Sequence, residues 1–152
     1  MTTHNLLSES RGGFLLSDDE TLLDMGKIFH WLSVESYWAN GREFDVNEKA
    51  FKHSYPIGVY EGSSQIAVAR MVSDSATFAW LCDVFVDLNF RGRGIGTWLA
   101  EASKEWATKN GIQRIILATR DAHDVYSRVG FEPLKNSQRW MEIDQRPQRD
   151  GH

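Results

Sequence analysis

The stretch Val84–Leu99, VFVDLNFRGRGIGTWL, decides the fold. An aromatic and β-branched run ends at Asp87, a short loop follows, and the glycine-rich turn 91–96 (RGRGIG) opens a helical pattern. Glycines let a backbone approach a ligand closely, so the N–H groups of the turn and of the helix N-terminus point at one place. Such a turn suits a phosphate or pyrophosphate, and Arg91 and Arg93 add positive charge.

Three phosphate-binding patterns compete for this turn. A P-loop requires a lysine that Gly96-Thr97-Trp98 lacks. A dinucleotide-binding turn requires a small residue where Leu99 stands and an acid after the next strand, which ends in Ala118-Thr119. The pattern Arg-x-x-Gly-x-Gly fits residues 91–96 without gaps. The alternative is a helix-capping loop whose glycines serve only tight packing.

Outward from the turn, the hydrophobic pattern alternates strands and helices. The right-handed crossover through the helix at 94–109 predicts that the strands before and after it are parallel. We see neither repeats nor a linker, so we expect one domain over 1–152, with residues 1–12 and 145–152 flexible. The expected strands cover 13–16, 57–61, 65–73, 77–87, 114–119, 131–134 and 140–143, and the expected helices cover 18–33 (behind the capping box Ser17–Glu20), 46–54, 94–109 and 122–129.

The composition is typical of a globular domain, and it excludes some classes of binding partner. The chain has 152 residues, 41% of them hydrophobic, and a net charge of -4, which argues against nucleic-acid binding. Because Cys82 is the single cysteine, no internal disulfide can form. No cluster of cysteines with the spacing of zinc ligands occurs, so the sequence predicts no metal site. The start lacks a signal-peptide pattern, and no apolar run reaches the ~18–20 residues of a membrane helix. We therefore expect a cytoplasmic protein without a membrane partner.

A second motif follows one helix and one strand after the turn. Residues 122–133 read AHDVYSRVGFEP. Together with RGRGIG, this sequence resembles the GCN5-related N-acetyltransferase (GNAT) family, whose first motif binds the pyrophosphate of acetyl-CoA and whose second carries Ala, Tyr four residues later, and Gly-Phe. The motif match covers about residues 78–134. It implies an α/β (α+β) fold in which a mixed, mostly antiparallel sheet is flanked by helices and split by the acetyl-CoA site.

The resemblance also implies acetyl-CoA as co-substrate and transfer of its acetyl group to a primary amine. Tyr126 would lie near the coenzyme sulfur and act as general acid; without the motif, a packing tyrosine would be the better interpretation. The strand near Phe85 would supply a backbone N–H to the thioester carbonyl. The implied cofactor-binding residues are Phe85, Val86, Arg91, Gly92, Arg93, Gly94, Ile95, Gly96, Thr97, Thr119 and Tyr126.

Two positions depart from the family pattern. Thr119 stands where members often carry Asn, and it would bond pantetheine less fully. Cys82 stands where many members carry Glu, so the usual carboxylate is missing, and we interpret this cysteine as an inert buried thiol. The general base is left open between Asp83, His123 and water. A hydrogen-bonded structural role is the alternative for Asp83.

The acceptor pocket is expected beneath residues 30–38, HWLSVESYW, between the first two helices. Aromatic rings with an acid could hold an amine by cation–π contact, although core packing is the alternative for each ring singly. The predicted acceptor residues are Trp31, Glu35, Tyr37, Trp38, Asp83, Asp121 and His123. We expect a small-molecule amine as acceptor and leave a homodimer open. A non-catalytic acyl-CoA sensor and a nucleotide-binding regulator are the alternative functions.

Overall fold

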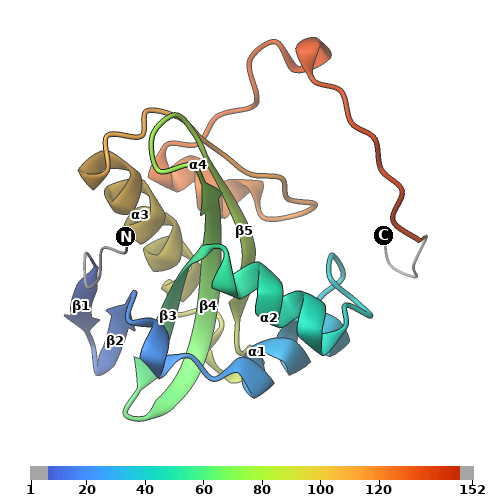
Figure 1. Ribbon diagram of the computed structural model, residues 1–152. Coiled ribbons are helices and arrows are strands. Elements are labelled where there is room, and N and C mark those ends of the chain that lie inside the picture. The colour runs from blue at the N-terminus through green and yellow to red at the C-terminus, as the bar shows by residue number, and fades with distance from the viewer. Residues whose placement is uncertain (1–6, 148–152) are drawn as a thin grey trace.

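Six strands form one mixed sheet (Figure 1). The computed structural model describes residues 7–147. Neighbours in the sheet follow chain order; the first five strands pair antiparallel, and the last pair is parallel. The predicted mixed, mostly antiparallel sheet is therefore confirmed, as is the parallel pair across the crossover. The strands are β1 (Ser8–Arg11), β2 (Phe14–Ser17), β3 (Tyr55–Glu61), β4 (Ser64–Ser73), β5 (Ala79–Val86) and β6 (Ile115–Ile116).

Helices cover both faces of the sheet, and each face has its own core. On one face, α3 (Ile95–Lys109) and α4 (His123–Val129) pack over the larger core, which includes Met71, Leu81, Leu99 and Trp106. On the other face, α1 (Met25–His30), its π-helical extension (Trp31–Glu35) and α2 (Phe44–Lys52) cover a smaller core of Ile28, Trp31, Leu32, Ala39, Phe51, Val68 and Phe85. In residues 7–147 no helix is both long and apolar enough to cross a membrane.

The start of the chain differs from the prediction in two places. Residues 8–11, expected to be flexible, form β1 along β2, and Trp98 donates to Glu9 over 2.7 Å. The long helix expected at 18–33 is broken: Asp19 caps only a 3₁₀ turn, and α1 begins at Met25 behind Asp24. The side chain of Gln65 accepts a 2.7 Å hydrogen bond from the backbone of Asp24 and holds it at the sheet. Residues 1–6 and 148–152, also expected to be flexible, lie outside the described residues.

The end of the chain also differs. The strands expected at 131–134 and 140–143 are absent from the described residues, and β6 is two residues long instead of six. Residues 131–147, here called the C-terminal arm, are irregular except for a 3₁₀ turn at Ser137–Arg139 and lead away from the sheet (Figure 1). Strand-like sequence needs a neighbouring strand to pair with, and the arm does not reach one.

A β-bulge interrupts the pairing of β4 with β5. The register passes from the pair Val68–Phe85 to the pair Arg70–Cys82, so two residues of β5 oppose one residue of β4. The first of these two, Asp83, has a left-handed φ of 52°. A bulge bends a strand and re-aims its side chains. Phe85 therefore packs in the α1–α2 core, whereas Leu81 before the bulge packs under α3.

Candidate active site

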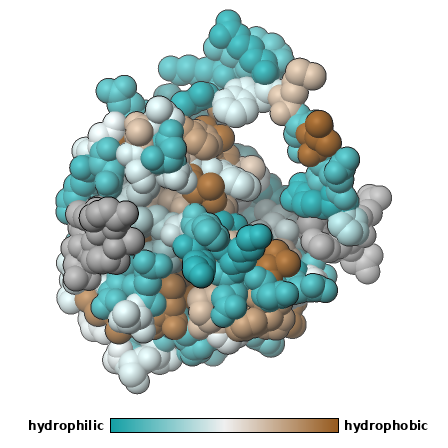
Figure 2. Space-filling view, viewed as in Figure 1, coloured by the Kyte–Doolittle hydropathy of each residue, from teal (hydrophilic) through white to brown (hydrophobic). Residues whose placement is uncertain are grey.

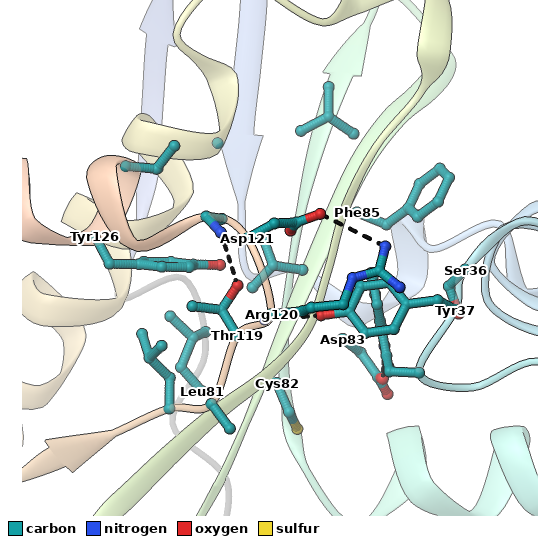
Figure 3. A pocket seen from close by; sticks show the side chains of 18 of the residues that line it. Ser36, Tyr37, Leu81, Cys82, Asp83, Phe85, Thr119, Arg120, Asp121 and Tyr126 are labelled. Atoms are coloured by element: carbon teal, nitrogen blue, oxygen red, sulfur yellow. Dashed lines mark hydrogen bonds and ion pairs between the residues drawn. The ribbon is translucent and has the colours of Figure 1, made fainter. Parts of the chain in front are cut away.

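A cavity of about 890 Å³ opens where β5 and β6 part, between the glycine turn, α4 and the loop before α2 (Figure 3). Trp31, Arg93 and His123, although predicted for the site, are not among the described residues that line it. The predicted site residues that do line it are Glu35, Tyr37, Trp38, Asp83, Phe85, Val86, Arg91, Gly92, Gly94, Ile95, Gly96, Thr97, Thr119, Asp121 and Tyr126.

The three residues outside the cavity have identifiable surroundings. Trp31 is buried and stacks on Phe85, with ring centroids 5.5 Å apart, so it belongs to the core. The guanidinium of Arg93 lies 5.2 Å from the ring centroid of Phe90. His123 is exposed at the first turn of α4. These three residues therefore do not line the cavity, and the binding roles given to them from sequence stay predictions.

The glycine turn presents bare backbone to the cavity. Gly92 and Gly94 have φ of 81° and 79°, a region that glycine adopts without strain. Helix α3 starts at Ile95 without a side-chain cap, so its first N–H groups lack the usual partner. A Cβ built on Gly96 meets no atom within 4 Å, so open space lies above the helix start. Unpaired N–H groups and the helix dipole together form an anion site.

Arg91 connects this turn to the end of β5. Its Nε donates to the carbonyl oxygen of Val86 over 2.9 Å, and its guanidinium carbon lies 5.0 Å from the ring centroid of Phe85. The arginine is therefore held by β5 while it lines the cavity beside the anion site.

Tyr126 points from α4 into the cavity, toward Thr119 (Figure 3). Burial, together with the nearby Tyr37, raises the pKa of Tyr126 to about 12, so the phenol is protonated at neutral pH. The hydroxyl of Thr119 accepts a 3.1 Å hydrogen bond from the backbone of Ala122. Thr119 thus ties the loop after β6 to the start of the helix that carries Tyr126.

Asp83 lies at the centre of a buried ionic cluster. Its Oδ2 accepts from Nε of Arg70 over 2.7 Å and from Nη1 of Arg42 over 2.8 Å. Its Oδ1 accepts from the indole of Trp38 over 2.8 Å and from Nη2 of Arg42 over 3.3 Å. Burial by itself would raise the pKa of Asp83, but the hydrogen bonds and charges of both arginines outweigh it and lower that pKa below its ordinary value.

This cluster argues against Asp83 as general base. A base that works near neutral pH needs a pKa near neutrality and an accessible lone pair. The carboxylate of Asp83 has a lowered pKa, and both of its oxygens already accept from charged donors. Cys82 does not replace it, because burial raises its thiol pKa to about 11. Of the three candidates named from sequence, water is the one left without an objection.

The expected aromatic amine box is not formed. The face of Tyr37 is covered by the guanidinium of Arg120, whose carbon lies 3.8 Å from the ring centroid. The indole of Trp38 is directed to Asp83, and Glu35 pairs with His30 over 3.1 Å. Asp121 lies 3.6 Å from the guanidinium of Arg120 at the exposed rim. These side chains border the cavity but are engaged with one another.

Sequence reasoning missed the two arginines of the cluster. Arg70 interrupts the apolar run QIAVARMVS, and a charged residue in a buried strand is a signal that could have been read. Arg42 follows Asn40-Gly41 and carries no comparable signal, because only the fold brings it to Asp83. The other lining residues that were not predicted include Trp80, Leu117, Ala118, Arg120, Val125 and Arg128.

Comparison with known proteins now identifies the family. The sequence pattern of the Acetyltransferase (GNAT) family matches residues 25–131, and the chain belongs to this family. It is a GNAT-type acetyltransferase. A provisionally named acetyltransferase of Gibberella zeae is 28% identical over 142 residues, which cover 78% of each chain.

Solved structures show the same fold. A GNAT-family protein of Xanthomonas campestris pv. campestris is 38% identical, superposes with a TM-score of 0.83, and the match covers 89% of this chain and 95% of that one. An acetyltransferase of Clostridium acetobutylicum solved with acetyl-CoA has a TM-score of 0.57 at 17% identity over 80% of this chain and 92% of that one. At that identity the second comparison shows the fold alone.

Removing the charge of Asp83 should destabilise the protein. Asp83→Asn leaves Arg42 and Arg70 buried without the acid they share, and breaking a buried ion pair from one side costs about 3–5 kcal/mol. Urea unfolding at pH 7 measures this loss. The exposed Asp121→Asn is the matched control and should cost less than about 1 kcal/mol.

The difference in stability between the wild-type protein and Asp83→Asn should decrease as the pH falls. Because folding lowers the pKa of Asp83, its contribution is present above the ordinary aspartate pKa of about 3.9 and is lost as the pH falls through the folded-state value. The wild-type protein and Asp83→Asn should therefore converge in stability at acid pH. Equal stabilities at pH 7 would contradict the role given to this cluster.

Proposed function

We propose that the protein transfers the acetyl group of acetyl-CoA to a primary amine of a small molecule by direct attack, with Tyr126 as general acid. The observation that carries this proposal is the joint position of the bare glycine turn and Tyr126 on one cavity at the parting of β5 and β6. The reaction needs a site that binds the anionic part of the cofactor, which the turn can provide. It also needs an acid that protonates the leaving group, which the phenol can provide.

Acetyl-CoA supplies an activated acyl group bound to a leaving thiol. For its pyrophosphate, the chain offers the first N–H groups of α3 and the charge of Arg91. The residues of β5 that follow the bulge, including Phe85 and Val86, line the cavity where the thioester would lie. As the amine nitrogen bonds to the carbonyl carbon and the carbon–sulfur bond breaks, Tyr126 gives its proton to sulfur. The newly acylated nitrogen loses its proton to water, and the phenolate of Tyr126 takes up a proton from water, which restores the acid.

An acyl-CoA sensor without turnover is the second candidate. It is favoured by one observation, which is that Cys82 occupies the position where a carboxylate base is common and has a raised pKa. Release of free coenzyme A thiol on addition of amines separates the two functions, because a sensor binds acetyl-CoA but releases none.

Gly96→Val tests the cofactor site. The added side chain would fill the open space above the start of α3, so acetyl-CoA affinity should fall at least about 10-fold, as expected when charge-assisted hydrogen bonds to an anion are blocked. Gly96 has helical backbone, so the change does not strain the fold, whereas Gly94 with φ of 79° would confound the result. Calorimetric titration with acetyl-CoA measures the affinity.

Gly26→Val is the control for Gly96→Val. It is the same substitution on a helical glycine, at a position where a Cβ would have only one neighbour at 3.7 Å and which does not line the cavity. Its affinity for acetyl-CoA should equal that of the wild-type protein. A folded Gly96→Val protein with wild-type affinity would remove the turn from the site.

Tyr126→Phe tests the general acid. The variant keeps the ring, which packs edge-on against Phe131 at 5.8 Å, and loses only the hydroxyl. Turnover should fall by about 10²–10⁴-fold while acetyl-CoA affinity changes little, because the lost interaction belongs to the transition state. With a pKa of about 12, Tyr126 should give no basic limb in the rate profile below pH 10.

The readout for Tyr126→Phe is thiol release under conditions where chemistry limits the rate. Near-wild-type turnover would show that water or another residue protonates the sulfur. Lost binding with retained turnover at saturation would make Tyr126 a cofactor ligand instead.

A further inference from the structure

The ionic cluster beside the cavity holds one positive charge more than it neutralises. Arg42 and Arg70 share the single carboxylate of Asp83, and among the described residues neither arginine has a second acidic partner. The side chains of Arg70 and Asp83 are 10% and 1% exposed, so solvent screens them little. An excess charge in such a place is costly unless another group compensates it.

The cluster still has donors to offer. Arg70 uses Nε for Asp83 and Nη1 for the hydroxyl of Ser54, and within residues 7–147 its Nη2 has no hydrogen-bond partner. Arg70 and Arg42 both line the cavity, so a ligand there can reach them. Glu35 lies 3.1 Å from His30, and within residues 7–147 no ion pair joins it to Arg42 or Arg70.

We propose that the acceptor amine carries an anionic group, a carboxylate or a phosphate, which binds at Arg42 and Arg70. This inference rests on the proposed function and names the substrate class of the same site. Arg42 and Arg70 line the same cavity as Tyr126, so one small molecule can carry both the amine and the anionic group. The excess charge also disfavours an ammonium and so helps the amine to reach its reactive neutral form.

Matched amines test the substrate class through thiol release. The pairs are 4-aminobutyrate with butylamine, and O-phosphoethanolamine with ethanolamine; they separate the carboxylate from the phosphate. The anionic member of at least one pair should have a kcat/KM about 10- to 100-fold higher, the usual effect of charge-assisted hydrogen bonds. Equal rates within both pairs, or a preference for the uncharged amines, would overturn the proposal.

Arg42→Gln supplies the second arm. It leaves Arg70 and Asp83 as a balanced pair, so the fold should persist, and the preference for the anionic amine should disappear while acetyl-CoA affinity stays unchanged. A preference that survives this substitution would also overturn the proposal. If acetyl-CoA does not bind or no amine releases thiol, the proposed function itself has failed, which is a different outcome.

Discussion

The shared carboxylate of Asp83 is the contact on which the site depends. It joins three segments that are far apart in sequence: Trp38 and Arg42 from the loop before α2, Arg70 from β4, and β5 itself. The bulge that gives Asp83 its left-handed backbone also turns Phe85 to the opposite face of the sheet. A single buried anion therefore fixes both the acceptor wall and the path of the strand that would receive the thioester. Buried charges of this kind specify geometry more than they add stability.

Much of the fold could be predicted because it rests on local patterns. The turn at 91–96, the helix behind it and the parallel pairing across the crossover follow from glycine positions, periodicity and chain handedness. The predictions that were wrong concern segments whose structure depends on contacts with distant parts of the chain. The helix expected at 18–33 is interrupted at Asp24, whose backbone donates to Gln65 of a distant strand. The segments 131–134 and 140–143 have no neighbouring strand among residues 7–147, and Figure 2 shows open space between the C-terminal arm and the body.

The candidate site also has one part that could be predicted from the sequence and one part that could not. The motif residues from Arg91 to Thr97 and Tyr126 lie on the cavity, apart from Arg93, because a motif encodes backbone geometry that one segment can build alone. The acceptor side could not be predicted, because its charges meet only in the folded chain. Trp31 illustrates this limit, since an aromatic residue in a core has the same sequence signature as one in a pocket.

The uneven charge of the cavity has a kinetic consequence. The chain as a whole carries -4, but among the described residues that line the cavity six are arginines and three are acidic. The distant field of the protein therefore repels a polyanion, and attraction begins only within about one Debye length, roughly 8 Å at physiological salt. An anionic ligand would therefore be attracted only inside the cavity, without long-range steering, and its association rate would be limited by the fraction of collisions that arrive at the mouth of the cavity.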